Sequence, residues 1–433
     1  MPTLQTTFFN AKIGFAVALT ASALRLGAAE WPQYHGPSLD NKTTVKLSPW
    51  PATGLKEVWR GPMTDGHSSI TVNGGKAYTL ILREFEGAKQ ESLLALDAAT
   101  GKELWAKPIG NVKINDGGQS GTADNSGGDG PRSTPSIDGD KVYVLSAKLV
   151  LSCFGTKDGA AVWQHDLVKE YAGRNISWDN AASPLIEGNL VLCAGGGPGQ
   201  SLLAFDKKTG ELVWKGEDDK MTHGTPTAAT IMVERQAIFF TQKGLVSVAP
   251  TTGKVLWRYD FPYNVSTAIT PVVCGDIVFC SAGYHHTAGA AKLAKNGDAW
   301  TATEIWRQKG SGKINHWSTP IYKDGYLYGM FGFKEYGTCP IKCFDVATGE
   351  EKWSKPGFGP GNVILAGDKL LALSDAGDLV LIDPNAKAYT ELARMKAVAG
   401  KCWGTPSIAE NRIYVRSSKE GACFELPKSV AAK

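Results

Sequence analysis

The feature that most constrains this chain is a short pattern that it writes several times. The segment "SLLALDAATGKELW" (92–105) returns almost unchanged as "SLLAFDKKTGELVW" (201–214), and each copy reads as an apolar strand, a turn and a second strand that ends in tryptophan. The same pattern continues in "VLSCFGTKDGAAVW" (150–163), "GLVSVAPTTGKVLW" (244–257), "PIKCFDVATGEEKW" (340–353) and, in its last part only, "TATEIW" (301–306). A unit that recurs at a period of roughly fifty residues predicts a repeat architecture.

A second pattern precedes each copy: an extended segment, a tight Gly-Asp or Gly-Asn turn, and another apolar strand. The clearest examples are "STPSIDGDKVYVLSA" (133–147) and "SPLIEGNLVLCAG" (183–195). Further examples lie at 69–82, 225–240, 270–283, 318–332, 363–375 and 405–418. A hairpin followed by the tryptophan-ending unit gives four antiparallel strands, which is one blade of a β-propeller. The sequence therefore predicts an all-β, eight-bladed propeller.

The two ends of the repeat array are complementary. The last hairpin is followed by one strand only, at 422–426, whereas "LKEVWRG" (55–61) is a tryptophan-ending strand that no hairpin precedes. We expect the N-terminal strand to be the outer strand of blade eight, with Val58 and Trp59 beside 421–426. Closing the propeller in this way removes an open sheet edge.

The alignment of the repeats assigns structural roles to most tryptophans and cysteines. The Trp row consists of Trp59, Trp105, Trp163, Trp214, Trp257, Trp306 and Trp353, and blade seven has Leu392 at the aligned position. Because the tryptophan recurs in all blades except blade seven, packing between blades is favoured over ligand binding. Cys153, Cys343 and Cys423 share a column with Ala and Ser, and Cys193 and Cys280 share an apolar column, which indicates small buried residues. Cys274, Cys339 and Cys402 lie outside these columns, and their pairing is left open.

Residues 1–29 read as a secretory signal, with Lys12, an apolar core and the small-residue end "GAA". The expected organisation is this signal, an extension at 30–54, the propeller at 55–427 and a tail at 428–433. Export implies a periplasmic or secreted location. We expect no membrane span, because no later apolar run is long enough, and no lipid anchor, because no cysteine lies near the cleavage site. The whole chain carries a net charge of +4 without a basic stripe, so nucleic acid is not an expected partner, and we expect a monomer.

The repeat unit resembles that of propellers built from pyrroloquinoline-quinone-type (PQQ-type) repeats, which read like Ala-x-Asp-x-x-Thr-Gly-x-x-x-Trp. Asp97, Thr100, Gly101 and Trp105 fit this unit, as do 206–214 and 345–353. The segments "WPQYHGP" (31–37), "GDGPRSTP" (128–135) and "GKCWGTP" (400–406) resemble the exported bacterial branch of that family. That branch is often related to an outer-membrane assembly propeller, which is a lipid-anchored scaffold. The chain is more distantly similar to the quinoprotein dehydrogenases, which hold the quinone over a Trp beneath a disulfide between adjacent cysteines, with calcium and an Asp base.

Propeller topology places the long connections and the tight turns on opposite faces, and we call these the loop face and the turn face. Binding residues concentrate on loops that a rigid scaffold holds, so the loop face is the expected site. The candidate residues are Arg132, Trp178, Asn180, His223, His316, Trp317, Lys401 and Trp403. The tryptophans supply flat apolar surface beside polar groups, which suits a protein or glycan partner. The alternative is that each tryptophan only seals the mouth of its own blade.

Metal and cofactor sites are less well supported by the sequence. His223, His285, His286 and His316 come from three consecutive blades and are the best subset for a metal, against the alternative of scattered surface histidines. Asp116, Asp124 and Asp129 could bind calcium, but their spacing does not match a known calcium loop. No catalytic residues are expected. The function predicted is a binding or scaffold module, and the alternative is an oxidoreductase that uses PQQ with calcium, although no two of the eight cysteines are adjacent.

Overall fold

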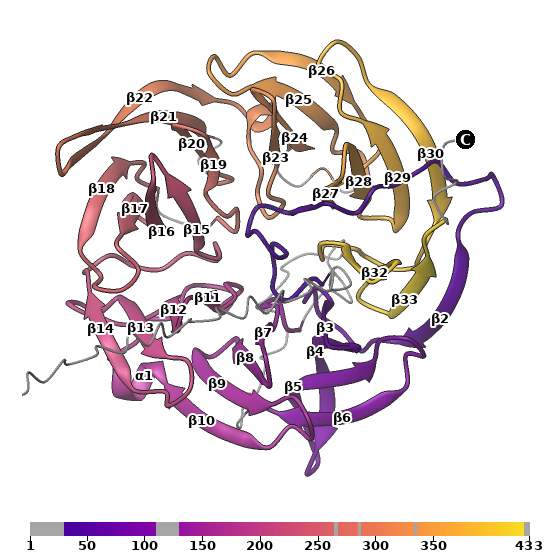
Figure 1. The fold of residues 1–433 in the computed structure, drawn as a ribbon, viewed down its shortest axis with the longest axis horizontal. Helices are drawn as coiled ribbons and strands as arrows, with labels where there is room; N and C mark the ends of the chain where they lie inside the picture. Colours follow the sequence, from indigo (N-terminus) through magenta and orange to yellow (C-terminus); the bar gives the residue numbers. More distant parts are fainter. Residues whose placement is uncertain are drawn as a thin grey trace, which may run out of the picture.

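The structure is a computed structural model that describes residues 30–109, 130–263, 267–284, 287–332, 335 and 337–427. Eight antiparallel sheets surround a central axis (Figure 1). The eight-bladed, all-β propeller predicted from the repeats is therefore confirmed. The expected signal at 1–29 and tail at 428–433 lie outside the described residues.

Blades one to four contain four strands each, ordered from the axis outward. They are β3 (Thr71–Asn73), β4 (Lys76–Phe85), β5 (Ala88–Asp97) and β6 (Glu103–Pro108); β7 (Ser136–Asp138), β8 (Lys141–Leu145), β9 (Val150–Gly155) and β10 (Ala161–Asp166); β11 (Leu185–Glu187), β12 (Leu190–Ala194), β13 (Leu202–Asp206) and β14 (Leu212–Gly216); β15 (Thr227–Ile231), β16 (Glu234–Thr241), β17 (Gly244–Val248) and β18 (Val255–Asp260).

Blades five to eight follow the same order. They are β19 (Val272–Cys274), β20 (Ile277–Ala282), β21 (Thr287–Asn296) and β22 (Ala299–Lys309); β23 (Ile321–Lys323), β24 (Tyr326–Met330), β25 (Ile341–Asp345) and β26 (Glu351–Lys355); β27 (Asn362–Ala366), β28 (Lys369–Leu373), β29 (Asp378–Asp383) and β30 (Thr390–Lys396); β31 (Ser407–Ala409), β32 (Arg412–Arg416), β33 (Glu420–Glu425) and β2 (Lys56–Pro62). The described helices are short: α1 (Leu167–Glu170) and a 3-10 turn η2 (Ser311–Lys313).

The predicted closure of the propeller is confirmed. Strand β2 pairs antiparallel with β33, and Trp59 lies opposite Cys423 in that pair. Val58 lies at a β-bulge between the paired residues Glu57 and Trp59. The first strand of the propeller thus completes the last blade, and no blade lacks its outer strand.

Packing between blades explains both the Trp row and the Asp-x-x-Thr-Gly turn. In blade one, Asp97 Oδ1 accepts hydrogen bonds from the backbone N–H groups of Ala99 and Thr100 and from the Thr100 hydroxyl. Gly101 then adopts φ +71°, and a Cβ at this position would lie 2.7 Å from the Trp59 indole of the neighbouring blade. The Trp59 Nε1–H donates to the Ala98 carbonyl of the same turn at 3.0 Å. The tryptophan of one blade therefore packs against the Asp-x-x-Thr-Gly turn of the next blade, as Trp59 of blade eight does against blade one.

The small-residue column is the register partner of the Trp row. Ala204 lies opposite Trp214, Ser247 opposite Trp257, and Cys153 opposite Trp163. Blade seven departs from the expectation, because Ala393 rather than Leu392 takes the tryptophan position, opposite Leu381. In blade seven the large residue, Leu381, therefore lies in the strand that carries the small residue elsewhere, and Leu392 occupies the bulge.

All eight cysteines are buried and free, so Cys274, Cys339 and Cys402 form no disulfides.

The first part of the segment 30–54, up to Thr43, lies in the central channel, which the sequence did not predict. Trp31 forms a bridge with Val72 of blade one, the Pro32 carbonyl accepts from the Ile137 N–H, and the Thr227 hydroxyl donates to the Leu39 carbonyl. The short strand β1 (Lys42–Thr43) then pairs parallel with β27 as a fifth strand of blade seven. Figure 1 shows this indigo segment at the centre of the propeller, from which it runs outward to β2.

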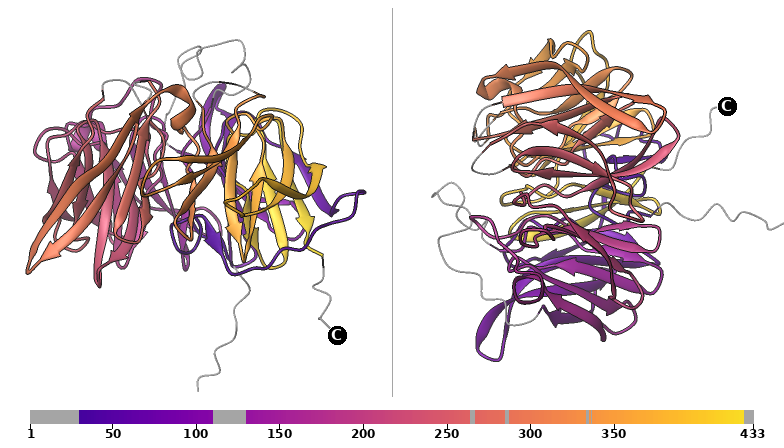
Figure 2. Two further views of the ribbon diagram at one scale, coloured as in Figure 1. Left: turned by 90° about the horizontal axis from the view of Figure 1, so that it is seen from above. Right: turned by 90° about the vertical axis from the view of Figure 1, so that its left-hand side faces the viewer.

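The contacts of Glu30, Trp31 and Pro32 fall where the innermost strands β3 and β7 lead into their tight turns. Glu30, for example, accepts from Asn73 and Gly74, which belong to the β3–β4 turn. His35 is 3% exposed and shares a hydrogen bond of 2.8 Å with the Thr270 hydroxyl of blade five. Burial lowers the pKa of His35 to about 3, so this histidine adds no charge to the channel at neutral pH. The first residues of the segment therefore occupy the turn-face end of the channel, and Figure 2 shows the propeller from the side, with the indigo segment between the blades.

Candidate binding site at the channel mouth

Six aromatic side chains meet at the loop-face end of the channel, and we call them the aromatic arc. The distances between successive ring centroids are 4.2 Å for His67 and Trp403, 4.5 Å for Trp403 and Trp317, 4.5 Å for Trp317 and His316, 5.1 Å for His316 and Tyr284, and 5.6 Å for Tyr284 and Trp178. Four members, Trp178, Tyr284, Trp317 and Trp403, are partly exposed, and the two histidines are buried. The arc joins residues more than three hundred positions apart into one surface.

The arc spans the mouth rather than following its rim from blade to blade. Trp403 precedes β31 of blade eight and Trp317 precedes β23 of blade six, so their contact passes over blade seven. Likewise, Tyr284 follows β20 of blade five, and its stacking partner Trp178 precedes β11 of blade three. The candidates Trp178, His316, Trp317 and Trp403 are thus brought together by the structure.

Backbone contacts hold the arc from below. The Trp317 Nε1–H donates to the Pro360 carbonyl at 3.0 Å. Asn362 Nδ2 donates to the Trp403 carbonyl at 2.5 Å. Because both contacts come from blade seven, the blade that the arc crosses also supports its two central tryptophans.

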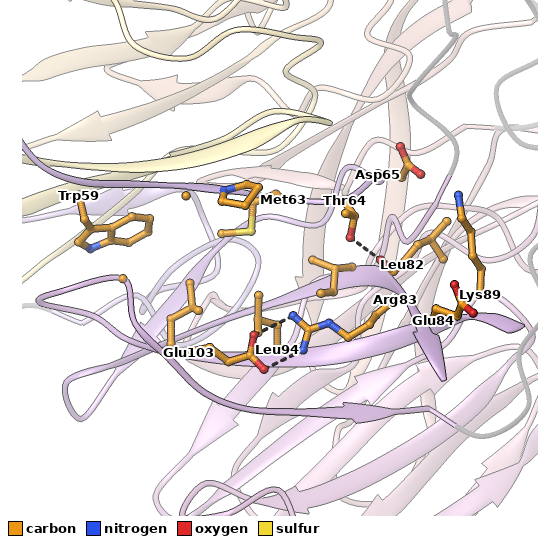
Figure 3. A pocket seen from close by; sticks show the side chains of 15 residues that line it. Trp59, Met63, Thr64, Asp65, Leu82, Arg83, Glu84, Lys89, Leu94 and Glu103 are labelled. Carbon is orange, nitrogen blue, oxygen red and sulfur yellow. Dashed lines mark hydrogen bonds and ion pairs between the residues drawn. The ribbon is translucent and has the colours of Figure 1, made fainter. Parts of the chain in front are cut away.

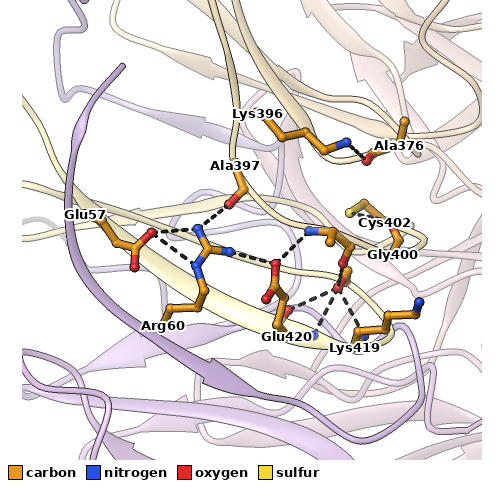
Figure 4. A network of polar contacts seen from close by, with 11 residues as sticks. Glu57, Arg60, Ala376, Lys396, Ala397, Gly400, Cys402, Lys419 and Glu420 are labelled. Atoms are coloured by element: carbon orange, nitrogen blue, oxygen red, sulfur yellow. Dashed lines mark hydrogen bonds and ion pairs between the residues drawn. The ribbon is translucent and has the colours of Figure 1, made fainter. Parts of the chain in front are cut away.

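A polar network ties the loop before Trp403 to the strand that closes the propeller (Figure 4). Arg60 of β2 pairs with Glu420 at 2.7 Å, and Glu420 also accepts from the Ala399 N–H at 2.7 Å. The Ser417 hydroxyl donates a hydrogen bond to the Ala399 carbonyl. The next residue, Ser418, donates its backbone N–H to the Lys401 carbonyl. Closure of the propeller therefore also fixes part of the candidate site.

The two predicted cations contact different tryptophans of the arc. Lys401 Nζ is 5.1 Å from the ring centroid of Trp403, within range of a cation–π contact. Arg132 Nη1 donates to the Trp178 carbonyl at 2.5 Å. Both side chains are partly exposed, so the mouth combines apolar ring surface with positive charge.

Two candidates lie beneath the mouth. Asn180 is 1% exposed, and its Nδ2 donates to the carbonyls of Leu145, Ser146 and Ala182, so its side chain supports the loop. His223 is 7% exposed, and burial followed by the nearby charge of Arg132 lowers its pKa to about 4. His223 is therefore a neutral side chain at physiological pH.

Sequence reasoning missed two members of the arc. Neither His67 nor Tyr284 is among the binding residues that the sequence predicts. Tyr284 stands in the loop "GYHHTAG" (283–289), whose position after the second strand of blade five was the available signal. Only the folded chain shows that Tyr284 bridges His316 and Trp178.

The metal hypothesis gains no support from the described part of the chain. His285, His286, Asp116, Asp124 and Asp129 lie outside the described residues. Among the residues that are described, no three His, Cys, Asp or Glu side chains are placed to hold one metal ion.

The residues of the mouth do not fit the quinone site that the family resemblance implies. That site uses adjacent cysteines over the quinone, whereas every cysteine of this chain is isolated in sequence and buried. The flat faces at the mouth are also engaged with one another, as in the stacked pair of His67 and Trp403, whose planes are 28° apart.

A cavity of about 460 Å³ lies away from the mouth, between the end of β2 and the long hairpin of β4 and β5 (Figure 3). Met63, Leu82 and Leu94 line it, and the ion pair between Arg83 and Glu103, at 2.7 Å, lies at its edge.

No helix among the described residues has the length and apolar character that a membrane span requires. None of the curated proteins compared matches this chain.

Solved structures that align with this chain include proteins of two kinds. The quinohemoprotein alcohol dehydrogenase of Comamonas testosteroni aligns with a TM-score of 0.61 and 13% identity, over 92% of this chain and 82% of that chain. The quinohemoprotein alcohol dehydrogenase ADHIIG of Pseudomonas putida HK5 gives 0.59 and 12%, over 94% and 81%. BamB of Moraxella catarrhalis gives 0.41 and 15%, over 86% and 100%. At these identities the likeness to the two dehydrogenases concerns the fold alone and not the activity.

A family model provides the stronger relation. Residues 89–329, more than half of the chain, match the PQQ-repeat model described as outer membrane protein assembly factor BamB. The matched range begins inside blade one and ends inside blade six, so it rests on the repeats themselves. This chain belongs to the PQQ-repeat β-propeller family that includes BamB.

Proposed function

We propose that this protein is an exported binding or scaffold module that captures a protein or glycan partner at its loop face. The observation that carries the proposal is the aromatic arc: partly exposed rings, flanked by Lys401 and Arg132 and held by backbone contacts. Aromatic side chains give a large contact area at low entropic cost, and arginine and tryptophan are frequent in the energetic centres of interfaces.

Export to the periplasm or to the medium is part of the same proposal. It is supported by the signal-like residues 1–29 and by membership of a family whose model carries the name of an outer-membrane assembly factor. N-terminal sequencing of the protein isolated from its source cells tests it. A mature chain that begins near Glu30 supports export, and a retained Met1 in a cytoplasmic fraction contradicts it.

The binding test compares two faces of one molecule. The variant Trp317→Ala with Trp403→Ala removes the centre of the arc, and Val233→Ser is the control, because Val233 is 97% exposed in the β15–β16 turn on the opposite face. Both are screened against a glycan array and by cross-linking in an extract of the source cells, after circular dichroism has verified folding. Binding that the arc variant loses and the turn variant keeps supports the proposal. Binding that survives in the arc variant assigns the partner to another surface.

The same preparation addresses the alternative function. Reconstitution with PQQ and calcium, followed by absorbance spectroscopy and a dye-linked alcohol oxidation assay, tests quinone-dependent activity. Retained quinone together with turnover would replace the binding proposal with an oxidoreductase.

A further inference from the structure

A buried carboxyl group lies directly behind the mouth. Glu91 belongs to β5 of blade one and is 0% exposed. Its Oε2 accepts a hydrogen bond from the Ala147 N–H at 2.8 Å. Within the described ranges, no group donates a hydrogen bond to its Oε1. A buried carboxyl oxygen without a donor is costly when the group is ionised, so this position needs an explanation.

Three charged groups on neighbouring segments lie close enough to Glu91 to influence its pKa. They are Arg132 before β7, Lys148 in the β8–β9 turn and Asp179 before β11. Burial is the largest influence and raises the pKa of Glu91; the Ala147 hydrogen bond lowers it, Asp179 raises it, and Arg132 and Lys148 lower it. The resulting pKa is about 7, so Glu91 changes its charge in the physiological range. His223 lies near Arg132 and is neutral there, as its pKa of about 4 shows.

Both cations are engaged with the loop that carries Trp178. Arg132 donates to the Trp178 carbonyl, and Lys148 Nζ lies 2.8 Å from each carboxylate oxygen of Asp179. The Ala147 carbonyl, next to the group that binds Glu91, accepts from Asn175 Nδ2 at 2.8 Å and from the Asn180 N–H at 2.9 Å. The carboxyl group and the loop therefore share the same few partners.

The loop needs these contacts because its backbone is strained. Trp178 has φ +69° and Asp179 has φ +61°, two consecutive residues in the left-handed region. A bulky residue is rare in this region, because its Cβ crowds the following carbonyl oxygen. Such conformations persist where surrounding contacts impose them and are often found at binding sites.

We propose that Glu91 is a proton-operated positioning residue for Trp178. When Glu91 is protonated, it is neutral and leaves Arg132 and Lys148 on the loop, with Trp178 stacked on Tyr284 at 5.6 Å. When Glu91 ionises, the buried carboxylate attracts one of the two cations. The loop then loses a contact, its strained backbone relaxes, and Trp178 leaves the arc. This inference extends the proposed function but does not depend on it, since it concerns the free protein.

The test follows Trp178 directly. The chain is produced with 5-fluorotryptophan, the resonance of Trp178 among the 13 tryptophans is assigned with Trp178→Phe, and its fluorine shift is recorded from pH 5 to pH 9. We expect a single transition with a midpoint near 7. In Glu91→Gln, which cannot ionise, the shift should stay at its low-pH value throughout. A transition that persists in Glu91→Gln would assign the titration to another group and overturn the proposal, as would the absence of a transition in the natural protein.

Two further variants keep the test decisive if Glu91→Gln does not fold. Lys148→Met removes a cation that favours ionised Glu91, so the midpoint should move to higher pH; an unchanged midpoint contradicts the proposal. Glu103→Gln is the control, because Glu103 lies in the same blade but pairs with Arg83 at the surface. Its transition should coincide with that of the natural protein. Because the titration uses the protein without any ligand, a negative result leaves the binding test unaffected.

Discussion

The contact between the turn glycine of one blade and the tryptophan of the previous blade makes a quantitative prediction. Gly253 has φ +72°, and a Cβ on it would lie 2.6 Å from Cε3 and 2.7 Å from Cδ2 of Trp214. Carbon atoms in favourable contact are about 3.5–4.0 Å apart, so the Gly253→Ala side chain would displace the indole by about 1 Å. We therefore expect Gly253→Ala to destabilise the protein through two separable effects.

The two effects can be measured apart, because the chain contains a matched glycine. Gly275 has φ +71° but no atom within 4 Å of its hypothetical Cβ. Gly275→Ala should therefore show only the left-handed penalty, about 1–2 kcal/mol. Gly253→Ala should add the cost of overpacking, about 1–3 kcal/mol. The free energy of unfolding of both variants, from denaturant titration, gives the difference.

A double-mutant cycle identifies the source of that difference. In a Trp214→Ala background the indole is absent, so the excess cost of Gly253→Ala over Gly275→Ala should disappear. Equal costs for the two glycine variants in the natural background would refute the reasoning. An excess that remains without the indole would refute it as well, because another contact would then be responsible.

Other predictions concern the Trp row, the buried carboxyl group and the segment in the channel. Trp214→Ala, which also removes the 2.7 Å hydrogen bond to the Pro250 carbonyl, should cost roughly 3–5 kcal/mol in a denaturant titration; unchanged stability with a lost ligand would make the row a recognition surface. The pKa of Glu91 is raised by burial to about 7, so the folded protein loses stability as the pH rises from about 4.5 through 7. Glu91→Gln should remove this loss and be more stable than the natural protein at pH 8.5 by up to about 3 kcal/mol, but not at pH 4. If the variant and the natural protein differ in free energy of unfolding by the same amount at both pH values, this prediction is wrong. Deletion of 30–54 should lower stability by removing buried Trp31 and Trp50 from the apolar core, and a deletion variant that melts like the full chain would show that the channel segment is dispensable.

The candidate site was predicted in part. The sequence placed four members of the arc on the loop face, because propeller topology alone assigns each loop to one face. It also named Asn180, whose side chain the structure places below the surface, because a polar residue beside a tryptophan gives no sign of its burial. Tyr284, the link between blades three and five, could not be recognised, since its partners follow from the relative positions of whole blades.

The sequence by itself determined the number of blades, the order of strands and the closure by β2. These properties depend on patterns that can be seen along the chain: the period-two alternation of strands and the chemistry of the Asp-x-x-Thr-Gly turn. The closure follows because the last blade lacks one strand and the N-terminal end supplies one extra strand. The position of Ala393 in blade seven escaped this reasoning, because a single bulge residue shifts the register without changing the composition of the strand.

Tertiary structure alone decided how the channel is filled and how the mouth is built. The segment 30–54 has no strand alternation, and its contacts with several different blades exist only after the propeller has closed around it. The burial of Glu91 and its placement behind Trp178 likewise require blades one, two and three to be in position together. Such contacts join residues that are distant in the chain, and their energies depend on the assembled packing and on the exclusion of water, which no local pattern encodes.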